Sequence, residues 1–368
     1  MIKRMRELDR CIKKIDFNIL WDHFTPSNYA IYNDEKFYIN DDLGLKINLI
    51  KKDSCFIGAV DERFVGNTAI LIDGQYVAIW NEKYITENTK DTKLASLLIH
   101  EMFHCFQYRN GEKRFPNELL GVEYPITVDN ISLRMLEREC LLNTVIEQDM
   151  EQQRKNLNTF FGIRNRREKL IGRALDYEKA IESVEGIAVY VELKSFTILE
   201  NKDIITGLKE YIEGFIDINQ ENLKIRHSTY NQGLLLGLAA DKLIPNWKKR
   251  FTESDLYLSD FLQKELNIQG DNIIYSNKKV DLIKSCVINW EMQRDEEFDE
   301  FERGKGTNVL LEDIAITGFD PMNLIKRKKE IIHKNFLRIK NNGKECIIKG
   351  PVKTTIGEHI FDVEKVEW

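Results

Sequence analysis

The feature that most constrains the fold of this chain is a predicted helix with two histidines on one face. From Asp91 onward, leucines and polar residues recur at the three- and four-residue spacing of an amphipathic helix, and the pattern ends at Asn110, before a glycine. We therefore predict a helix over about 91–109. It contains the segment His100-Glu101-Met102-Phe103-His104. The leucines would anchor this helix in a core.

The spacing of these histidines predicts a metal site. Residues four apart lie one above the other on a helix, so His100 and His104 can both point a ring nitrogen at one ion. Glu101 is about 100° further round the helix, close enough to take a proton from a water on that ion. Zn²⁺ suits such ligands and lowers the pKa of a bound water towards 7. The segment therefore predicts zinc-dependent hydrolysis, with Glu101 as the general base.

The same segment has a simpler explanation, in which two histidines are merely hydrogen-bonded on a buried helix face. The chain has only six histidines, too few for chance to place them often around a glutamate in this pattern, so we favour the metal site. Two alternatives remain open. One is a non-catalytic metal-binding or interaction protein, and the other is a helical scaffold without metal.

A zinc site with an open position for water needs a third protein ligand. The other histidines have no recognisable ligand spacing, and they are His23, His227, His333 and His359. A carboxylate is the better candidate. A later helical segment carries four glutamates on one face, and they are Glu178, Glu182, Glu185 and Glu192. Carboxylates crowded on one stripe repel each other unless a cation lies near them.

Among these glutamates we favour Glu185 as the third ligand and keep Glu182 as an alternative. The residue after it, Gly186, costs about 1 kcal/mol relative to alanine in a helix interior. A close approach by another helix would explain that glycine. For Glu178 and Glu192 we expect a solvated acidic face.

Together, these segments resemble the gluzincin metallopeptidases, whose third ligand is a glutamate on a later helix. The stretch from Glu185 to Glu192 reads Glu-Gly-Ile-Ala-Val-Tyr-Val-Glu and is similar to the Asn-Glu-Gly-Phe-Ala-x-Tyr-x-Glu stretch of zinc aminopeptidases. In those enzymes the glutamate before the glycine binds the metal, which implies the same role for Glu185. The chain also resembles uncharacterised bacterial zincin-like proteins.

The chain departs from the aminopeptidases in several places. Glu185 follows His104 by 81 positions, a longer interval than in those enzymes, and Val184 replaces their asparagine. No Gly-x-Met-x-Asn segment is present to bind a substrate amino terminus, so the resemblance implies a metallopeptidase but not an exopeptidase. Those enzymes place their third ligand nineteen positions after the motif, where this chain has Glu123 in a predicted loop. Glu123 therefore stays a second alternative.

The resemblance also implies a tyrosine or histidine near the metal that stabilises the oxyanion. Tyr230 and His227 are the candidates, because they open a predicted core helix over about 227–242. Tyr190, one turn beyond the favoured ligand, is a weaker one. A further carboxylate should orient a ligating imidazole, and Asp129 and Glu139 are equally placed for that role.

The rest of the chain predicts an α+β protein with a predominantly helical, zincin-like catalytic core, an N-terminal β-hairpin region and a small C-terminal β-unit. We place an N-terminal mixed α/β lobe at 1–90, the helical core at 91–290 and the C-terminal segment at 291–368. The predicted elements are a helix at 3–20, a hairpin at 68–80, a loop at 115–129, helices at 130–161 and 165–200 with a break near Gly162, and strands at 336–340, 345–349 and 359–364.

Composition narrows the function further. The net charge is −6 and the charges are interspersed, so the sequence shows no basic cluster of the kind that binds nucleic acid or an anionic membrane. No apolar run approaches the roughly 20 residues of a membrane span, and the start of the chain does not read as a signal peptide. The six cysteines lack a C-x-x-C pair, so we expect reduced thiols and a cytoplasmic protein. The expected partner is a peptide or protein substrate.

Overall fold

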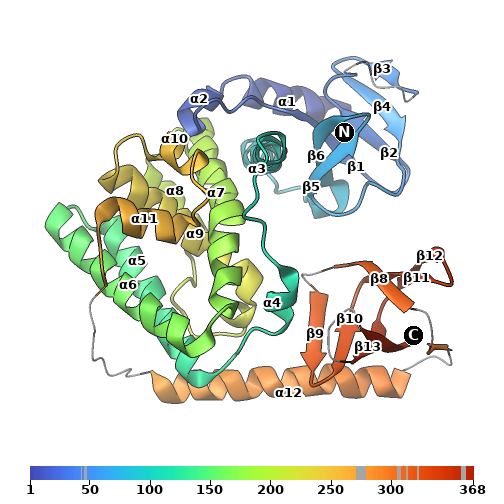
Figure 1. Cartoon of the computed structure of the whole chain (residues 1–368). Coiled ribbons are helices and arrows are strands. Elements are labelled where there is room, and N and C mark those ends of the chain that lie inside the picture. The colour runs from blue at the N-terminus through green and yellow to red at the C-terminus, as the bar shows by residue number, and fades with distance from the viewer. Residues whose placement is uncertain are drawn as a thin grey trace.

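The computed structural model describes residues 1–42, 44, 48–270, 279–304, 308–311, 314–320, 323–357 and 362–368. Over these residues the chain is an α+β protein with a six-stranded N-terminal sheet, a helical layer and two small C-terminal sheets (Figure 1). The helices are α1 (Ile2–Ile12), α2 (Phe17–Leu20), α3 (Asp91–Arg109), α4 (Glu118–Val122), α5 (Val128–Ile146), α6 (Met150–Ile171), α7 (Ala174–Glu200), α8 (Ile204–Tyr211), α9 (Ile225–Leu243), α10 (Trp247–Thr252), α11 (Leu258–Leu266) and α12 (Val280–Gly304). The strands are β1 (Asn28–Tyr32), β2 (Lys36–Ile39), β3 (Ile50–Lys52), β4 (Cys55–Ala59), β5 (Thr68–Ile72), β6 (Gln75–Asn81), β7 (Val309–Leu310), β8 (Ile314–Phe319), β9 (Leu324–Arg327), β10 (Glu330–His333), β11 (Phe336–Asn341), β12 (Lys344–Lys349), β13 (Val352–Ile356) and β14 (Val363–Glu367).

The N-terminal sheet has the order β3-β4-β2-β1-β6-β5, and β1 and β6 are its parallel pair. The predicted hairpin over 68–80 is confirmed as β5 and β6. Its turn is made by Asp73 and Gly74, whose φ angles are 47° and 82°. Both lie in the left-handed region that a type I′ hairpin turn requires, which aspartate tolerates and glycine adopts freely. β5 forms one edge of the sheet.

The predicted helix over 91–109 is confirmed as α3, with the same bounds. It contacts β5 and β6 on one side and α7 on the other, and Figure 1 shows it end-on between the sheet and α7. Its side chains are buried almost continuously from Leu94 to Gln107. Two histidines and a glutamate are therefore carried into the interior, where buried polar groups need partners.

The boundaries of the next helices differ from the prediction. The predicted helix over 130–161 and break near Gly162 are wrong, because Gly162 lies inside α6. The actual breaks follow local chemistry. Asp149 caps α6 by accepting a hydrogen bond from the Gln152 amide at 3.1 Å, and Gly172 ends it with a φ of 52°. The segment predicted as a loop over 115–129 includes the short helix α4.

The predicted close approach of a helix to Gly186 is confirmed. A Cβ on Gly186 would lie 2.4 Å from the Cα of Gly233 in α9, a distance that real Cβ atoms do not show. α7 and α9 therefore cross with their backbones in direct contact, which only a pair of glycines permits. This crossing holds the start of α9 beside the middle of α7.

The C-terminal residues form more strands than predicted. The strands expected at 336–340 and 345–349 are confirmed as β11 and β12, with Asn342 and Gly343 in the turn. Of the third expected strand, 359–361 lie outside the described residues, and Val363 and Glu364 form the start of β14. The sheets have the orders β7-β14-β13-β10-β9 and β12-β11-β8. Figure 1 shows α12 running beneath this unit. The acidic run at 295–302 lies on α12, which turns Phe298 and Phe301 inward.

The sequence predicts neither a membrane-spanning helix nor disulfide bonds. None of the described helices combines the length and the apolar character needed to cross a bilayer. All six cysteines carry free thiols.

Candidate metal centre

Two neighbouring helices bring three predicted ligands together. α3 contributes His100 and His104, and α7 contributes Glu185. The two Nε2 atoms lie 3.1 Å apart, and Oε2 of Glu185 lies 3.3 Å from Nε2 of His104 and 3.8 Å from Nε2 of His100. Among the described residues, these three form the His/Cys/Asp/Glu group whose ligand atoms lie close enough to share one ion.

The triangle of donor atoms has the size that zinc requires. At metal–ligand distances of about 2.0–2.1 Å, two ligands of a tetrahedral zinc ion lie about 3.3 Å apart. The observed edges of 3.1, 3.3 and 3.8 Å bracket that value. Two imidazoles and one carboxylate are also a ligand set typical of catalytic zinc. The side chains therefore fit a tetrahedral ion with one position left for water or substrate.

Glu192 orients the first imidazole. Its Oε2 lies 3.1 Å from Nδ1 of His100, so a proton on Nδ1 leaves the Nε2 lone pair for a metal. Lys93 and Tyr211 donate to the other carboxylate oxygen at 2.8 and 2.9 Å. Burial raises the pKa of the Glu192 carboxyl, but Lys93 and His100 outweigh it and hold the pKa at about 2. Glu192 is therefore ionised at neutral pH.

Gln107 orients the second imidazole. Its Oε1 lies 2.7 Å from Nδ1 of His104, and its amide nitrogen donates to the carbonyl of Val184 at 3.0 Å. The amide thus fixes which nitrogen of His104 faces the centre. Val184 is the residue before Glu185, so the Gln107 side chain also links α3 to the turn of α7 that carries Glu185.

An arginine positions Glu185, the third candidate ligand. Arg226, in the first turn of α9, donates to Oε1 of Glu185 at 3.0 Å and to Glu118 at 2.5 Å. Tyr177 donates to the second oxygen of Glu118 at 3.0 Å. Burial raises the pKa of Glu185, but His104, His100 and Arg226 hold it well below its usual value. One oxygen of Glu185 is thus committed to Arg226 and the other faces the histidines.

Glu101 lies beside the ligands with its carboxylate uncommitted. The residue is buried, and no hydrogen bond joins its carboxylate to another of the described residues. Burial raises its pKa, and the nearby charges of Glu185 and Glu192 raise it further, against the effect of the two histidines. The Glu101 carboxylate is therefore more basic than that of a glutamate in water.

The two oxyanion candidates have different surroundings. Tyr230 is partly buried, and burial together with the charges of Glu185 and Glu101 raises the pKa of its hydroxyl. His227 is exposed at the surface, with its ring centroid 5.4 Å from that of Tyr230. Tyr190 faces elsewhere and donates to Asp241 at 2.9 Å.

The alternative ligands are engaged in ion pairs away from the centre. Glu182 is fully buried and makes two bonds of 2.7 Å with Arg164 of α6. Glu123 is exposed and pairs with Lys326 of β9 at 2.5 Å. Among the described glutamates of α7, Glu185 is thus the one that faces both histidines.

The expectation of a solvated acidic face on α7 is wrong. Glu178 is 0% exposed and Glu192 only 5%. Both are buried because cations from other elements neutralise them: Lys93 of α3 pairs with Glu192, and Arg134 of α5 pairs with Glu178 at 2.9 Å. The spacing along α7 gives no sign of these partners.

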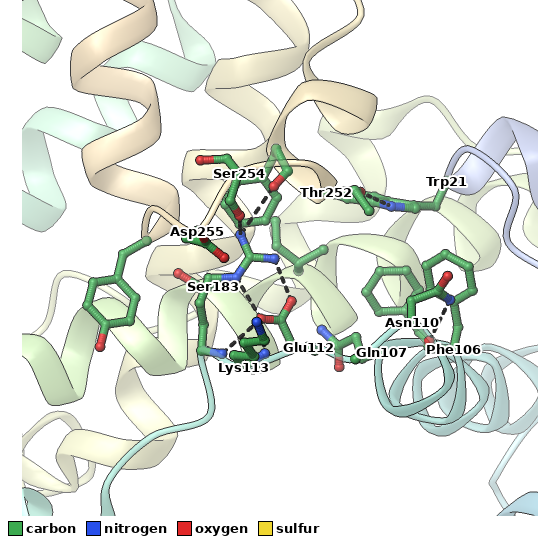
Figure 2. Close-up of a pocket in the computed structure, with 16 residues that line it drawn as sticks. Trp21, Phe106, Gln107, Asn110, Glu112, Lys113, Ser183, Thr252, Ser254 and Asp255 are labelled. Carbon is green, nitrogen blue, oxygen red and sulfur yellow. Dashed lines mark hydrogen bonds and ion pairs between the residues drawn. The ribbon is translucent and has the colours of Figure 1, made fainter.

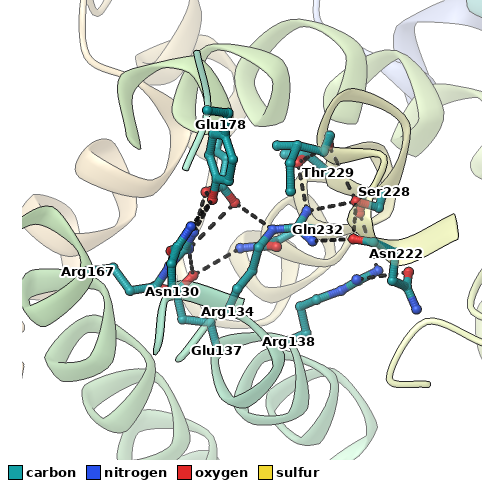
Figure 3. A network of polar contacts seen from close by, with 12 residues as sticks. Asn130, Arg134, Glu137, Arg138, Arg167, Glu178, Asn222, Ser228, Thr229 and Gln232 are labelled. Atoms are coloured by element: carbon teal, nitrogen blue, oxygen red, sulfur yellow. Dashed lines mark hydrogen bonds and ion pairs between the residues drawn. The ribbon is translucent and has the colours of Figure 1, made fainter. Parts of the chain in front are cut away.

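Glu178 belongs to a buried polar network that joins α5, α6, α7 and α9 (Figure 3). Arg134 donates to Glu178 and, at 2.9 Å, to Thr229 of α9. Arg167 of α6 pairs with both Glu178 and Glu137. The network therefore holds α7, and with it the metal-facing turn, against three other helices.

The residues that orient the imidazoles were missed from the sequence. Asp129 and Glu139, the expected candidates, are both exposed. The observed partners are Glu192 and Gln107. The sequence does contain an indication of both partners. Glu192 lies seven residues after Glu185 and so shares its helix face, and Gln107 lies three residues after His104, within one helical turn.

A cleft of about 840 Å³ lies behind the centre, between the end of α3, the loop after it and the segment 252–257. Figure 2 shows Gln107, Glu112 and Ser254 on its wall. Arg114 also lines the cleft and donates to the carboxylate of Glu112 at 2.5 Å and to the carbonyl of Ser254 at 3.5 Å. Gln107 lines this cleft, whereas His100, Glu101, His104 and Glu185 do not. The cleft therefore adjoins the outer side of His104 and not the side where the donor atoms converge.

Comparison with protein families, with curated proteins and with solved structures finds no significant match to this chain. The function is therefore argued from the residues and geometry of the site.

Proposed function

We propose that this chain is a zinc-dependent hydrolase, a metallopeptidase of the gluzincin type that cleaves peptide or other amide bonds. The observation that carries the proposal is the convergence of the donor atoms of His100, His104 and Glu185, next in sequence to the buried, uncommitted carboxylate of Glu101. A site that only stabilised the fold would have no need of a buried carboxylate without a partner.

The proposed roles follow from the positions of the side chains. When bound, zinc would lower the pKa of a water molecule and polarise the carbonyl of the scissile bond. Glu101 accepts the proton that the water gives up and passes it to the nitrogen of the leaving amine. Tyr230, whose raised pKa keeps its hydroxyl protonated at neutral pH, donates a hydrogen bond to the oxygen that gains negative charge. The exposed His227 is the second candidate for that role.

The sheet edge beside α3 favours a peptide as the substrate. β5 pairs with β6 on one side and is the last strand in the order of the sheet. The backbone groups of an edge strand can pair with an extended peptide, which supplies affinity independent of sequence. Because β5 also contacts α3, a peptide bound there would run along the helix that carries the metal ligands.

The test is hydrolysis of a mixed peptide library by the zinc-loaded wild type, Glu101→Gln and Glu123→Gln. Glu123 is the matched control, because it is an exposed glutamate paired with Lys326. We expect all three proteins to bind one zinc ion, the control to cleave like the wild type, and Glu101→Gln to lose about 10²–10⁴-fold in kcat/KM. Equal inertness of zinc-loaded wild type and Glu101→Gln on every peptide would refute the hydrolase proposal.

A second candidate is a non-catalytic metal-binding protein with the same ligands. It is favoured by the position of the 840 Å³ cleft, which does not open on the donor atoms. The two candidates differ in what zinc does for stability. A structural site should lose much of its fold when stripped of metal, whereas we expect the apo protein to stay folded because α3 packs between the sheet and α7 and its apolar side chains belong to the main hydrophobic core.

A further inference from the structure

Three aromatic rings form a parallel stack at the end of α3. The ring centroids of Tyr76 and Tyr108 are 5.2 Å apart with 15° between the planes, and those of Tyr108 and Phe115 are 5.0 Å apart with 14°. Leu71 of β5 stands opposite Tyr76 in the hairpin, so its side chain lies on the same face of the sheet. We call these four residues the aromatic shelf.

Three of the four shelf residues are exposed, although their side chains are apolar or aromatic, and Tyr76 is half-buried. Leu71 is 50% exposed, Tyr108 40% and Phe115 36%. The four residues come from four segments, namely β5, β6, the last turn of α3 and the loop that follows it. Single exposed apolar side chains are common on protein surfaces, but a contiguous group drawn from separate segments is typical of a binding surface.

The shelf begins one helical turn from the proposed metal centre. Tyr108 lies four residues after His104 and seven after Glu101, so all three share one face of α3. At 1.5 Å per residue, Tyr108 is about 6 Å further along the helix axis than His104. The charges of Glu185 and Glu101 also act on the Tyr108 hydroxyl, where they add to burial in raising its pKa.

These distances match a peptide laid along α3 beside the edge strand. An extended chain advances about 3.3 Å per residue, so 6 Å corresponds to about two residues. A flat aromatic side chain placed there could extend the existing stack, and the four shelf side chains offer it no charge. Aromatic pairs in such offset parallel arrangements stabilise each other beyond the burial of their area.

We infer that the aromatic shelf is a specificity subsite that binds an aromatic or large aliphatic side chain of a peptide substrate, within about two residues of the scissile amide. This inference rests on the proposed function and names its substrate class. It assigns Tyr108 and Phe115 to substrate binding, apart from the residues that hold the metal or move the proton.

The first arm of the test measures selectivity in cleavage. A peptide that the wild type cleaves is remade with alanine, aspartate or phenylalanine at each of the two positions on either side of the cleaved bond. We expect a preference of about tenfold or more for phenylalanine over alanine at one of these positions, the range of a hydrophobic subsite. Tyr108→Ser should abolish that preference, and Tyr108→Phe, which keeps the ring, should restore it.

A matched control separates the shelf from tyrosine loss in general. Tyr84 is 54% exposed and lies in the short turn Glu82–Tyr84, outside the shelf. Tyr84→Ser should keep both the activity and the preference. Cleavage that shows no preference for large apolar side chains, or a preference that survives Tyr108→Ser and Phe115→Ser, overturns the subsite and leaves the hydrolase proposal intact.

The second arm measures binding without turnover. Zinc-loaded Glu101→Gln, with or without Tyr108→Ser, is titrated calorimetrically with a blocked alanine pentapeptide carrying phenylalanine at its centre and with the all-alanine peptide. We expect about tenfold tighter binding of the phenylalanine peptide, lost with Tyr108→Ser. The same result in a protein that cleaves nothing supports the shelf and refutes the hydrolase. The absence of both cleavage and selective binding overturns both proposals.

Discussion

The interaction between Glu192 and His100 offers a direct test of the proposed metal centre. Glu192 is buried, and its Oε2 lies 3.1 Å from Nδ1 of His100, on the far side of the ring from the donor nitrogen. A metal on Nε2 draws charge from the imidazole, so an ionised partner on Nδ1 stabilises the bound state more than a neutral one does. Glu192→Gln keeps the shape and removes the charge.

The expected magnitude follows from the kind of hydrogen bond lost. A hydrogen bond to a charged group contributes about 1.5–3 kcal/mol and a neutral one about 0.5–1.5 kcal/mol. Glu192→Gln should therefore weaken zinc binding by about 1–1.5 kcal/mol, or about tenfold in Kd. Glu192→Ala loses the whole bond, so its loss should reach about 100-fold. Lys93 can turn to solvent in both variants, because its side chain is already 35% exposed.

The assay is competition for zinc between each variant and a chromogenic chelator at neutral pH. Glu200→Gln is the matched control, because Glu200 is also on α7 and also reaches across to the start of α3, where it accepts from Thr92 at 2.5 Å, but it touches no ligand. Its Kd should equal that of the wild type. If both Glu192 variants bind zinc as tightly as the wild type, or the control weakens as much, then Glu192 does not tune the metal.

Three further predictions concern the scaffold, and chemical denaturation measures each. Gly186→Ala places a Cβ 2.4 Å from the backbone of Gly233 and should cost about 1–3 kcal/mol or more of stability, whereas Gly304→Ala, with nothing within 4 Å of the new atom, should change it by less than about 0.5 kcal/mol. Arg167→Met leaves two buried glutamates short of a cation and should destabilise the fold by about 3–5 kcal/mol; a loss below about 1 kcal/mol would mean that the network is not electrostatically tight. Burial lowers the pKa of His333 from 6.5 to about 4. Between these pH values His333 is protonated in the unfolded chain but neutral in the folded chain. The free energy of unfolding should therefore fall by about 3 kcal/mol as the pH drops from about 6.5 to 4. His333→Gln should abolish that part of the acid sensitivity, and an unchanged pH profile would contradict the assignment.

The helix α3, which carries the two histidines, was the most predictable part of the protein. The bounds of α3 and the convergence of its two histidines depend only on the helical period, which is a local property of the chain. The turn at Asp73 and Gly74 is local in the same way. Glu185 was favoured because it and the glycine after it resemble the ligand-bearing stretch of zinc aminopeptidases, and the structure accounts for that glycine by the crossing with Gly233.

The partners of the ligands could not be predicted in the same way. The spacing on α7 shows which residues share a face, but not what lies opposite that face. Glu178 and Glu192 look like surface glutamates in the sequence, yet both are buried against cations from α5 and α3. Ion pairs between residues 44 or 99 positions apart leave no periodic pattern.

The sequence alone determined the helix, the spacing of its histidines and the place of Glu101 beside them, because each depends on backbone geometry over a few neighbouring residues. The tertiary structure decided which glutamate faces the histidines, which side chains orient their rings and which aromatic rings gather at the end of α3. Those outcomes depend on which helices pack together and which buried charges neutralise one another across them, and both are set by the packing of the whole molecule.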